Sequence, residues 1–82
     1  MKHEVEMDNY IQEVYSNIGE LFKKVRKEKK ITVRDIYRDT GICIACISQL
    51  ERASNFPRLA IIIKLADYLG IPLTDVLSEK VV

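Results

Sequence analysis

A chain of 82 residues is long enough for one small domain and too short for two, because each domain needs a core of its own. An apolar fraction of 48% and a charged fraction of 30% exclude a disordered chain. No apolar run reaches the roughly 18 residues that cross a bilayer, and MKHEVEMDNY, the first ten residues, lacks the apolar centre of a signal peptide. The net charge is +1, but the charges are unevenly distributed along the chain. Residues 21–58 are basic, with ten Lys or Arg and four acidic residues, whereas residues 1–20 are acidic, with one Lys and five acidic residues. We expect a cytoplasmic protein with no membrane contact.

The apolar spacing predicts five helices and no strand, so the expected fold class is all-α. The first helix is predicted over residues 18–29, after a capping-box-like start at Asn17 and Glu20. Its apolar positions are Ile18, Leu21, Phe22 and Val25. Residues 8–16 continue this spacing and predict an additional amphipathic turn or two, contiguous or not with the first helix. Three interpretations of residues 8–16 stay open: packing on the domain itself, a dimer contact and disorder.

The next two predicted helices are short and joined by a turn. Thr32 is placed to cap a helix over residues 33–39 whose Ile36 faces inward, and Gly41 then supplies a sharp turn. A helix over residues 43–52 follows, with Ile47 and Leu50 facing the preceding helix. This order is a helix-turn-helix by spacing alone.

Two further helices complete the predicted bundle. Pro57 opens a helix over residues 58–69 that stops at Gly70, and Pro72 starts a short helix through Leu77. The fourth helix is predicted to bury Leu59, Ile62, Leu65, Ala66 and Leu69. The expected division is an N-terminal extension over 1–17, a domain over 18–79 and a tail over 80–82.

Residues 18–77 resemble the phage-repressor and Cro-type helix-turn-helix domains of the XRE family. The matching features, in chain order, are Gly19, KKVRKEK, Thr32, Ile36, Gly41, Ile47, Ser48, Leu50-Glu51-Arg52, Pro57 and LADYLGI. The resemblance implies a compact five-helix fold like that of lambda repressor. It also implies a bacterial or phage transcription regulator, a repressor, which binds a pseudo-palindromic operator in double-stranded DNA as a homodimer and needs no cofactor.

Carried over position by position, the resemblance assigns two sets of DNA-facing residues. The base-facing set is Ile44, Ala45, Ser48 and Gln49, and the phosphate-facing set is Val33, Arg34, Arg52 and Arg58. The chemistry agrees for several of them, because a Gln amide can pair with adenine N6 and N7 and aliphatic side chains can contact thymine methyl groups. Gln49 is the strongest candidate for specificity.

Three residues depart from the family pattern, as does the segment 43–46, where several polar residues are common in the family. Val33 stands where a polar residue is common and cannot donate to a phosphate. Tyr37 stands where a small Ala is common, so we expect an altered spacing between the two helices of the motif. Ala53 replaces a Gly, and a left-handed cap without Gly costs only about 1 kcal/mol.

Cys43 and Cys46 leave two interpretations open. Cys43 takes the place of a capping Ser, so both can be small structural residues; alternatively they form a thiol switch in which the helix dipole lowers the pKa of Cys43. A metal site would need two further ligands. Two cysteines this close favour a reducing compartment, and with His3 as the one histidine no catalytic constellation is apparent, so we predict neither an enzyme nor a metal site.

An alternative function is a protein-interaction module, an antitoxin or adaptor that captures a protein partner through an apolar patch including Ile44 and Ile61. Candidate dimer contacts are Tyr10, Val14, Leu77, Val81 and Val82. The run KKVRKEKK, residues 23–30, carries six positive charges and is interpreted as a solvated face that complements the helix dipole and attracts phosphate at long range.

Overall fold

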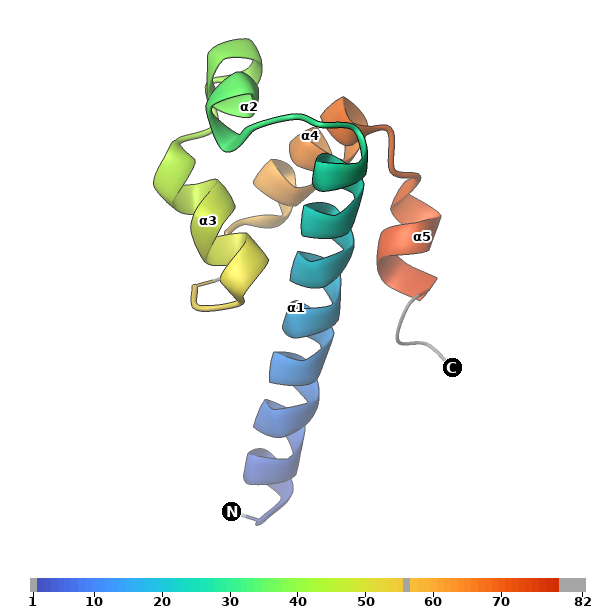
Figure 1. Cartoon of the computed structure of the whole chain (residues 1–82). Helices are drawn as coiled ribbons and strands as arrows, with labels where there is room; N and C mark the ends of the chain where they lie inside the picture. The colour runs from blue at the N-terminus through green and yellow to red at the C-terminus, as the bar shows by residue number, and fades with distance from the viewer. Residues whose placement is uncertain (1, 56, 79–82) are drawn as a thin grey trace.

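The computed structural model describes residues 2–55 and 57–78, and all regular structure within them is helical. The elements are α1 (Lys2–Glu28), α2 (Val33–Thr40), α3 (Ile44–Arg52), α4 (Leu59–Leu69) and α5 (Leu73–Ser78). Figure 1 shows α2 to α5 gathered around the C-terminal half of α1, while the N-terminal half of α1 extends beyond them. The predicted all-α, five-helix fold is confirmed.

The start of α1 differs from the prediction. The expected start at Ile18 is wrong, because the chain is already helical from Lys2, and the alternative that residues 8–16 join the first helix is confirmed. The physical reason is continuity of the inward stripe: Val14 packs against the same core that buries Ile18 and Phe22. No Gly or Pro interrupts residues 8–18, so the helix passes through Asn17 without a break.

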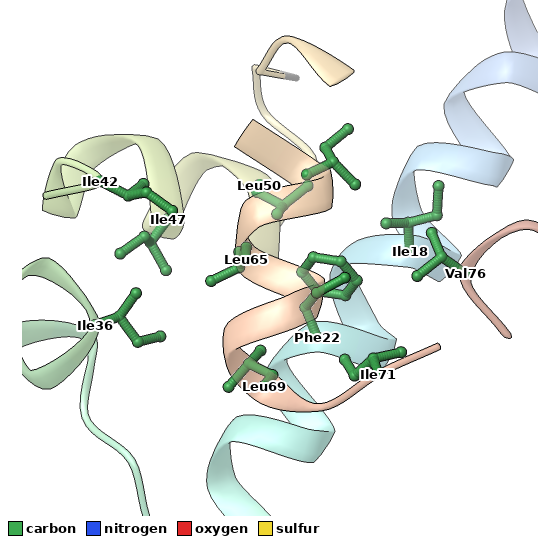
Figure 2. Close-up of a cluster of buried hydrophobic side chains, with 12 residues drawn as sticks. Ile18, Phe22, Ile36, Ile42, Ile47, Leu50, Leu65, Leu69, Ile71 and Val76 are labelled. Atoms are coloured by element: carbon green, nitrogen blue, oxygen red, sulfur yellow. The ribbon is translucent and has the colours of Figure 1, made fainter. Parts of the chain in front are cut away.

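The core joins the helix-turn-helix to α1 and α4. Its six most deeply buried large side chains are Phe22, Ile36, Ile47, Leu50, Leu65 and Leu69. Figure 2 shows Phe22 of α1 beside Leu65 and Leu69 of α4, with Ile36 and Ile47 continuing the cluster toward α2 and α3. The two helices of the motif therefore have their positions fixed by one shared apolar cluster.

One predicted core residue of α4 is not in the core. Ile62, Leu65, Ala66 and Leu69 are buried as predicted, but Leu59 is 62% exposed. Leu59 is the first residue of α4 and lies two turns before Ala66 on the same side of the helix, so it projects past the end of the cluster. Ile61, predicted to join an apolar surface patch, instead packs against the core and is partly buried.

Gly19 is required where α1 crosses α3. A Cβ atom at this position would lie far inside van der Waals contact with the Leu50 carbonyl oxygen and 3.2 Å from the Glu51 carbonyl oxygen. Both neighbours are backbone atoms of α3, which cannot rotate away as the end of a flexible side chain can. The absence of a side chain at Gly19 thus sets how closely α3 approaches α1.

We expect Gly19→Ala to destabilise the protein by about 1–3 kcal/mol, because overpacking against a backbone has that cost. Helix propensity alone predicts the opposite sign, a gain of about 1 kcal/mol for Ala over Gly. Urea unfolding decides between the two effects, with Glu20→Ala as a neighbouring exposed control. A Gly19→Ala protein more stable than the wild type would contradict the close crossing.

Candidate nucleic-acid interface

The start of α2 is fixed by reciprocal hydrogen bonds. The Thr32 N–H donates to Asp35 Oδ2 at 3.0 Å, and the Asp35 N–H donates to Thr32 Oγ1 at 3.0 Å. The Thr32 N–H is the largest influence holding the pKa of Asp35 below its usual value, with further help from the Thr32 side chain. The predicted cap at Thr32 is confirmed and is a full capping box.

The turn between α2 and α3 is closed by its own hydrogen bonds. Gly41 adopts the left-handed conformation, with φ of 80°, and its N–H donates to the Tyr37 carbonyl oxygen at 2.9 Å. The Thr40 hydroxyl donates to the Ile36 carbonyl oxygen at 2.7 Å and accepts from the Ile42 N–H at 3.0 Å. Ile42 is buried in the core, so the turn and the shared apolar cluster together set the relative direction of the two helices.

The outward face of α3 carries the predicted base-facing residues. Helical spacing puts Ile44, Ala45, Ser48, Gln49 and Arg52 on one side of α3, and we call these five residues the reading face. Ile44, Ala45 and Arg52 are exposed, whereas Ser48 and Gln49 are half-buried. The opposite side buries Ile47 and Leu50, as predicted. The reading face therefore combines aliphatic, hydroxyl, amide and guanidinium groups on a helix whose back is held in the core.

The three predicted phosphate-facing arginines are exposed and come from different elements. Arg34 lies in the first turn of α2, Arg52 in the last turn of α3, and Arg58 at the N-cap of α4. The positive charge of Arg58 acts to lower the pKa of Cys46, against the larger raising effects of the hydrogen bond to Cys43 and of burial. Val33, also assigned to phosphate, is half-buried and packs against the core instead.

Residues of α1 hold the C-terminal end of α3, a support that was not predicted from the sequence. Gln12, Gly19 and Arg26, each seven residues apart, reach the last turn of α3 and its cap. Gln12 Nε2 donates to the Ala53 carbonyl oxygen at 3.0 Å. Arg26 forms a bidentate pair with Glu51, at 2.7 Å from Nε to Oε2 and 3.1 Å from Nη2 to Oε1.

Arg26 departs from the prediction for the basic run. The lysines of the run are exposed as expected of a solvated face, but the Arg26 side chain is only 12% exposed and that of Glu51 only 8%. Arg26 Nη1 also donates to the Ile31 carbonyl oxygen at 2.9 Å. The available signal was periodicity, because Arg26 follows Phe22 by four residues and so lies on the inward side of α1.

Two of the departures from the family pattern have structural outcomes. Tyr37 is 50% exposed, so half of its surface lies outside the packing of the motif, and the altered spacing of α2 and α3 stays a prediction. Its hydroxyphenyl group adds to the outer surface of α2. Ala53 adopts the left-handed cap as expected, with φ of 55°, and its N–H donates to the Leu50 carbonyl oxygen at 3.0 Å.

The predicted dimer contacts are distributed unevenly. Tyr10 is 50% exposed on the extended half of α1, whereas Val14 is partly buried against the protein's own core. Leu77 lies in α5, but its side chain is outside the described residues, as are Val81 and Val82 entirely. Of the predicted contact residues whose side chains the structure describes, Tyr10 is exposed and Val14 is partly buried.

Comparison with known proteins gives one match. A family model described as a helix-turn-helix domain matches residues 19–81, most of the chain. Neither the curated proteins nor the solved structures give a match. No helix within the described residues is long and apolar enough to span a membrane, and no group of three or more His, Cys, Asp or Glu side chains there is arranged to hold a metal ion.

Proposed function

Since the chain belongs to the helix-turn-helix domain family, we propose that it is a transcriptional repressor that binds a pseudo-palindromic DNA operator as a homodimer. Family membership points to a DNA-binding regulator. The operator, the repressing role and the homodimer are the parts that we add to it.

The reading face is the observation that carries this proposal. Gln49 offers an amide that can bond adenine N6 and N7, and Ser48 offers a hydroxyl that suits several base edges. Ile44, 39% exposed, and Ala45 beside it are suited to the methyl groups of thymine. We therefore expect half-sites that contain T and A at the positions under α3.

The three exposed arginines support the positioning part of the proposal. Arg34, Arg52 and Arg58 are exposed and can bind phosphates, which fixes orientation without reading sequence. In a homodimer, two copies of α3 would enter successive major grooves about 34 Å apart. The exposed Tyr10 and Ile11 on α1 are the dimer contact that we favour, since Val14 is already engaged in its own core.

The test is selection of bound sequences from random duplex DNA with the fully reduced protein, followed by titration of the enriched site at two salt concentrations. Enrichment of an inverted repeat with T-containing half-sites is the expected result. Weak binding with a steep salt dependence and no enriched sequence would overturn the proposal. The exposed Ile44 and Leu59 would then be examined as the surface of a protein-interaction module.

We expect Gln49→Ala to weaken binding to the selected site by about 1–3 kcal/mol and to relax the preference at one base pair, because one bidentate base contact is removed. Repeating the selection with the variant measures this directly. Identical sites for variant and wild type would show that Gln49 does not face the bases.

Arg58→Ala provides the contrast, because losing a phosphate contact should weaken all sequences alike and reduce the salt slope by about 1. Lys29→Ala removes the same charge from the end of α1, beside Gly70, and is the charge-matched control. A larger effect of Lys29→Ala than of Arg58→Ala on the salt slope would contradict the phosphate role of Arg58.

A further inference from the structure

The sulfur atoms of Cys43 and Cys46 lie 3.4 Å apart at the N-terminus of α3. A disulfide bond is about 2.05 Å long, so about 1.3 Å separates the two thiols from bonding distance. Both cysteines are free, with Cys43 exposed and Cys46 half-buried against the core. The pair, which we call the dithiol, is thus accessible from solvent on one side only.

The two thiols differ in their surroundings in the way that thiol–disulfide exchange requires. Cys43 is the N-cap of α3, and its Sγ accepts from the Cys46 N–H at 3.3 Å. That backbone bond is the main cause that lowers the pKa of Cys43, and the Ala45 N–H adds to it. The hydrogen bond to Cys43 and then burial raise the pKa of Cys46, against a smaller opposite effect from Arg58. Cys43 is therefore the better nucleophile, and Cys46 is placed behind it.

We propose that Cys43 and Cys46 form a reversible dithiol–disulfide site that takes a small-molecule disulfide as its oxidant and controls the DNA affinity of α3. The Cys43 thiolate attacks one sulfur of the oxidant, so a mixed disulfide forms and one thiolate leaves. Cys46 then loses its proton, and its sulfur attacks Cys43 Sγ to release the second thiolate. The protein loses two protons and two electrons, and the oxidant takes them up and becomes two thiols.

The effect on DNA affinity rests on the proposed function. Cys43 immediately precedes Ile44, the first residue of the reading face, and its sulfur caps the first turn of α3. Cys46 packs against the core, and bonding the two sulfurs requires one or both side chains to shift, which changes the cap. Because an N-cap interaction amounts to about 1 kcal/mol, we expect about fivefold weaker operator binding by the oxidised protein.

The experiment treats reduced full-length protein with oxidised glutathione and follows its mass and free thiols. We expect loss of two hydrogens and of both thiols, and full reversal by dithiothreitol. Cys46→Ser should stop at a stable glutathione adduct on Cys43. Cys43→Ser keeps a good N-cap, and its Cys46 should react at least about tenfold more slowly than Cys43 does in Cys46→Ser.

Absence of the internal disulfide, or equal rates for the two single variants, would overturn the proposal whether or not the protein binds DNA. Disulfide formation with unchanged affinity for the selected operator would overturn its control of DNA affinity. Failure of the reduced protein to select any DNA would instead count against the proposed function, since the mass and thiol measurements do not involve DNA.

Discussion

Replacing Glu51 with alanine should lower the free energy of unfolding by about 3–5 kcal/mol, because it leaves the Arg26 charge buried without its partner. The pair is bidentate and largely buried, with 12% of the Arg26 side chain and 8% of the Glu51 side chain exposed. A domain of this size is stable by only about 5–15 kcal/mol, so the loss is a large fraction of the total. Urea unfolding followed by circular dichroism measures it.

The exposed ion pairs of Arg38 provide the matched control for Glu51. The Arg38 side chain is 68% exposed and contacts Asp35 at 3.1 Å and Asp39 at 3.0 Å, so Arg38→Ala should cost at most about 1 kcal/mol. The double variant Arg26→Met/Glu51→Leu should recover most of the lost stability, because no charge is then buried alone. Equal losses of unfolding free energy in Glu51→Ala and Arg38→Ala would show that burial of the Arg26–Glu51 pair does not affect stability.

Phe22→Ala should be the second large loss, about 3–5 kcal/mol, because it removes a whole aromatic side chain from the core and leaves a cavity. Phe22 has no exposed surface and lies at the centre of the cluster in Figure 2. Thermal unfolding should show a strongly lowered Tm for this variant.

Tyr10→Ala on the same helix is the control for Phe22→Ala. Because Tyr10 is 50% exposed, its truncation should change monomer stability by no more than about 0.5 kcal/mol. It should instead lower the fraction of dimer in sedimentation experiments, in keeping with the contact proposed above. A Tyr10→Ala protein that unfolds as readily as Phe22→Ala would place Tyr10 in the fold rather than at a dimer contact.

The helix-turn-helix itself was predictable because its determinants are local. Thr32, Gly41 and the spacing of Ile36, Ile47 and Leu50 define two short helices and a turn within about twenty residues, where capping and periodicity operate. The start of α1 was not, because Asn17 and Glu20 fit a capping box only if the preceding residues leave the helix. The packing of Val14 on the core instead keeps the residues before Asn17 in the helix.

The contacts of α1 with the C-terminal end of α3 could not be predicted from the sequence, for another reason. Arg26 and Glu51 are 25 residues apart, and Gln12 and Ala53 are 41 apart, so no local pattern pairs them. The exposure of Leu59 could not be predicted from local pattern either. Its periodic position is correct for burial, but the core does not extend as far as the first residue of α4. Which end of a helix the core covers depends on how the helices are arranged.

The cap at Cys43 was predictable from its place before the helix, whereas the approach of the two sulfur atoms was not. A CxxC spacing is compatible with structural cysteines and with a dithiol alike. The difference depends on side-chain direction, and in the structure Cys43 Sγ lies 3.3 Å from the Cys46 nitrogen and 3.4 Å from Cys46 Sγ.

The attachment of α3 at one end has a consequence for how the protein can be altered. Residues 50–53, at the C-terminal end of α3, are contacted by Gln12, Gly19 and Arg26. At the N-terminal end of α3, Ile44 and Ala45 are exposed on the outer side. Substitutions at these two positions leave the α1 attachments and the core contacts of Ile47 and Leu50 in place. The scaffold and the outer side of α3 are thereby separable, so the side chains that α3 presents to solvent can be exchanged while the bundle keeps its stability.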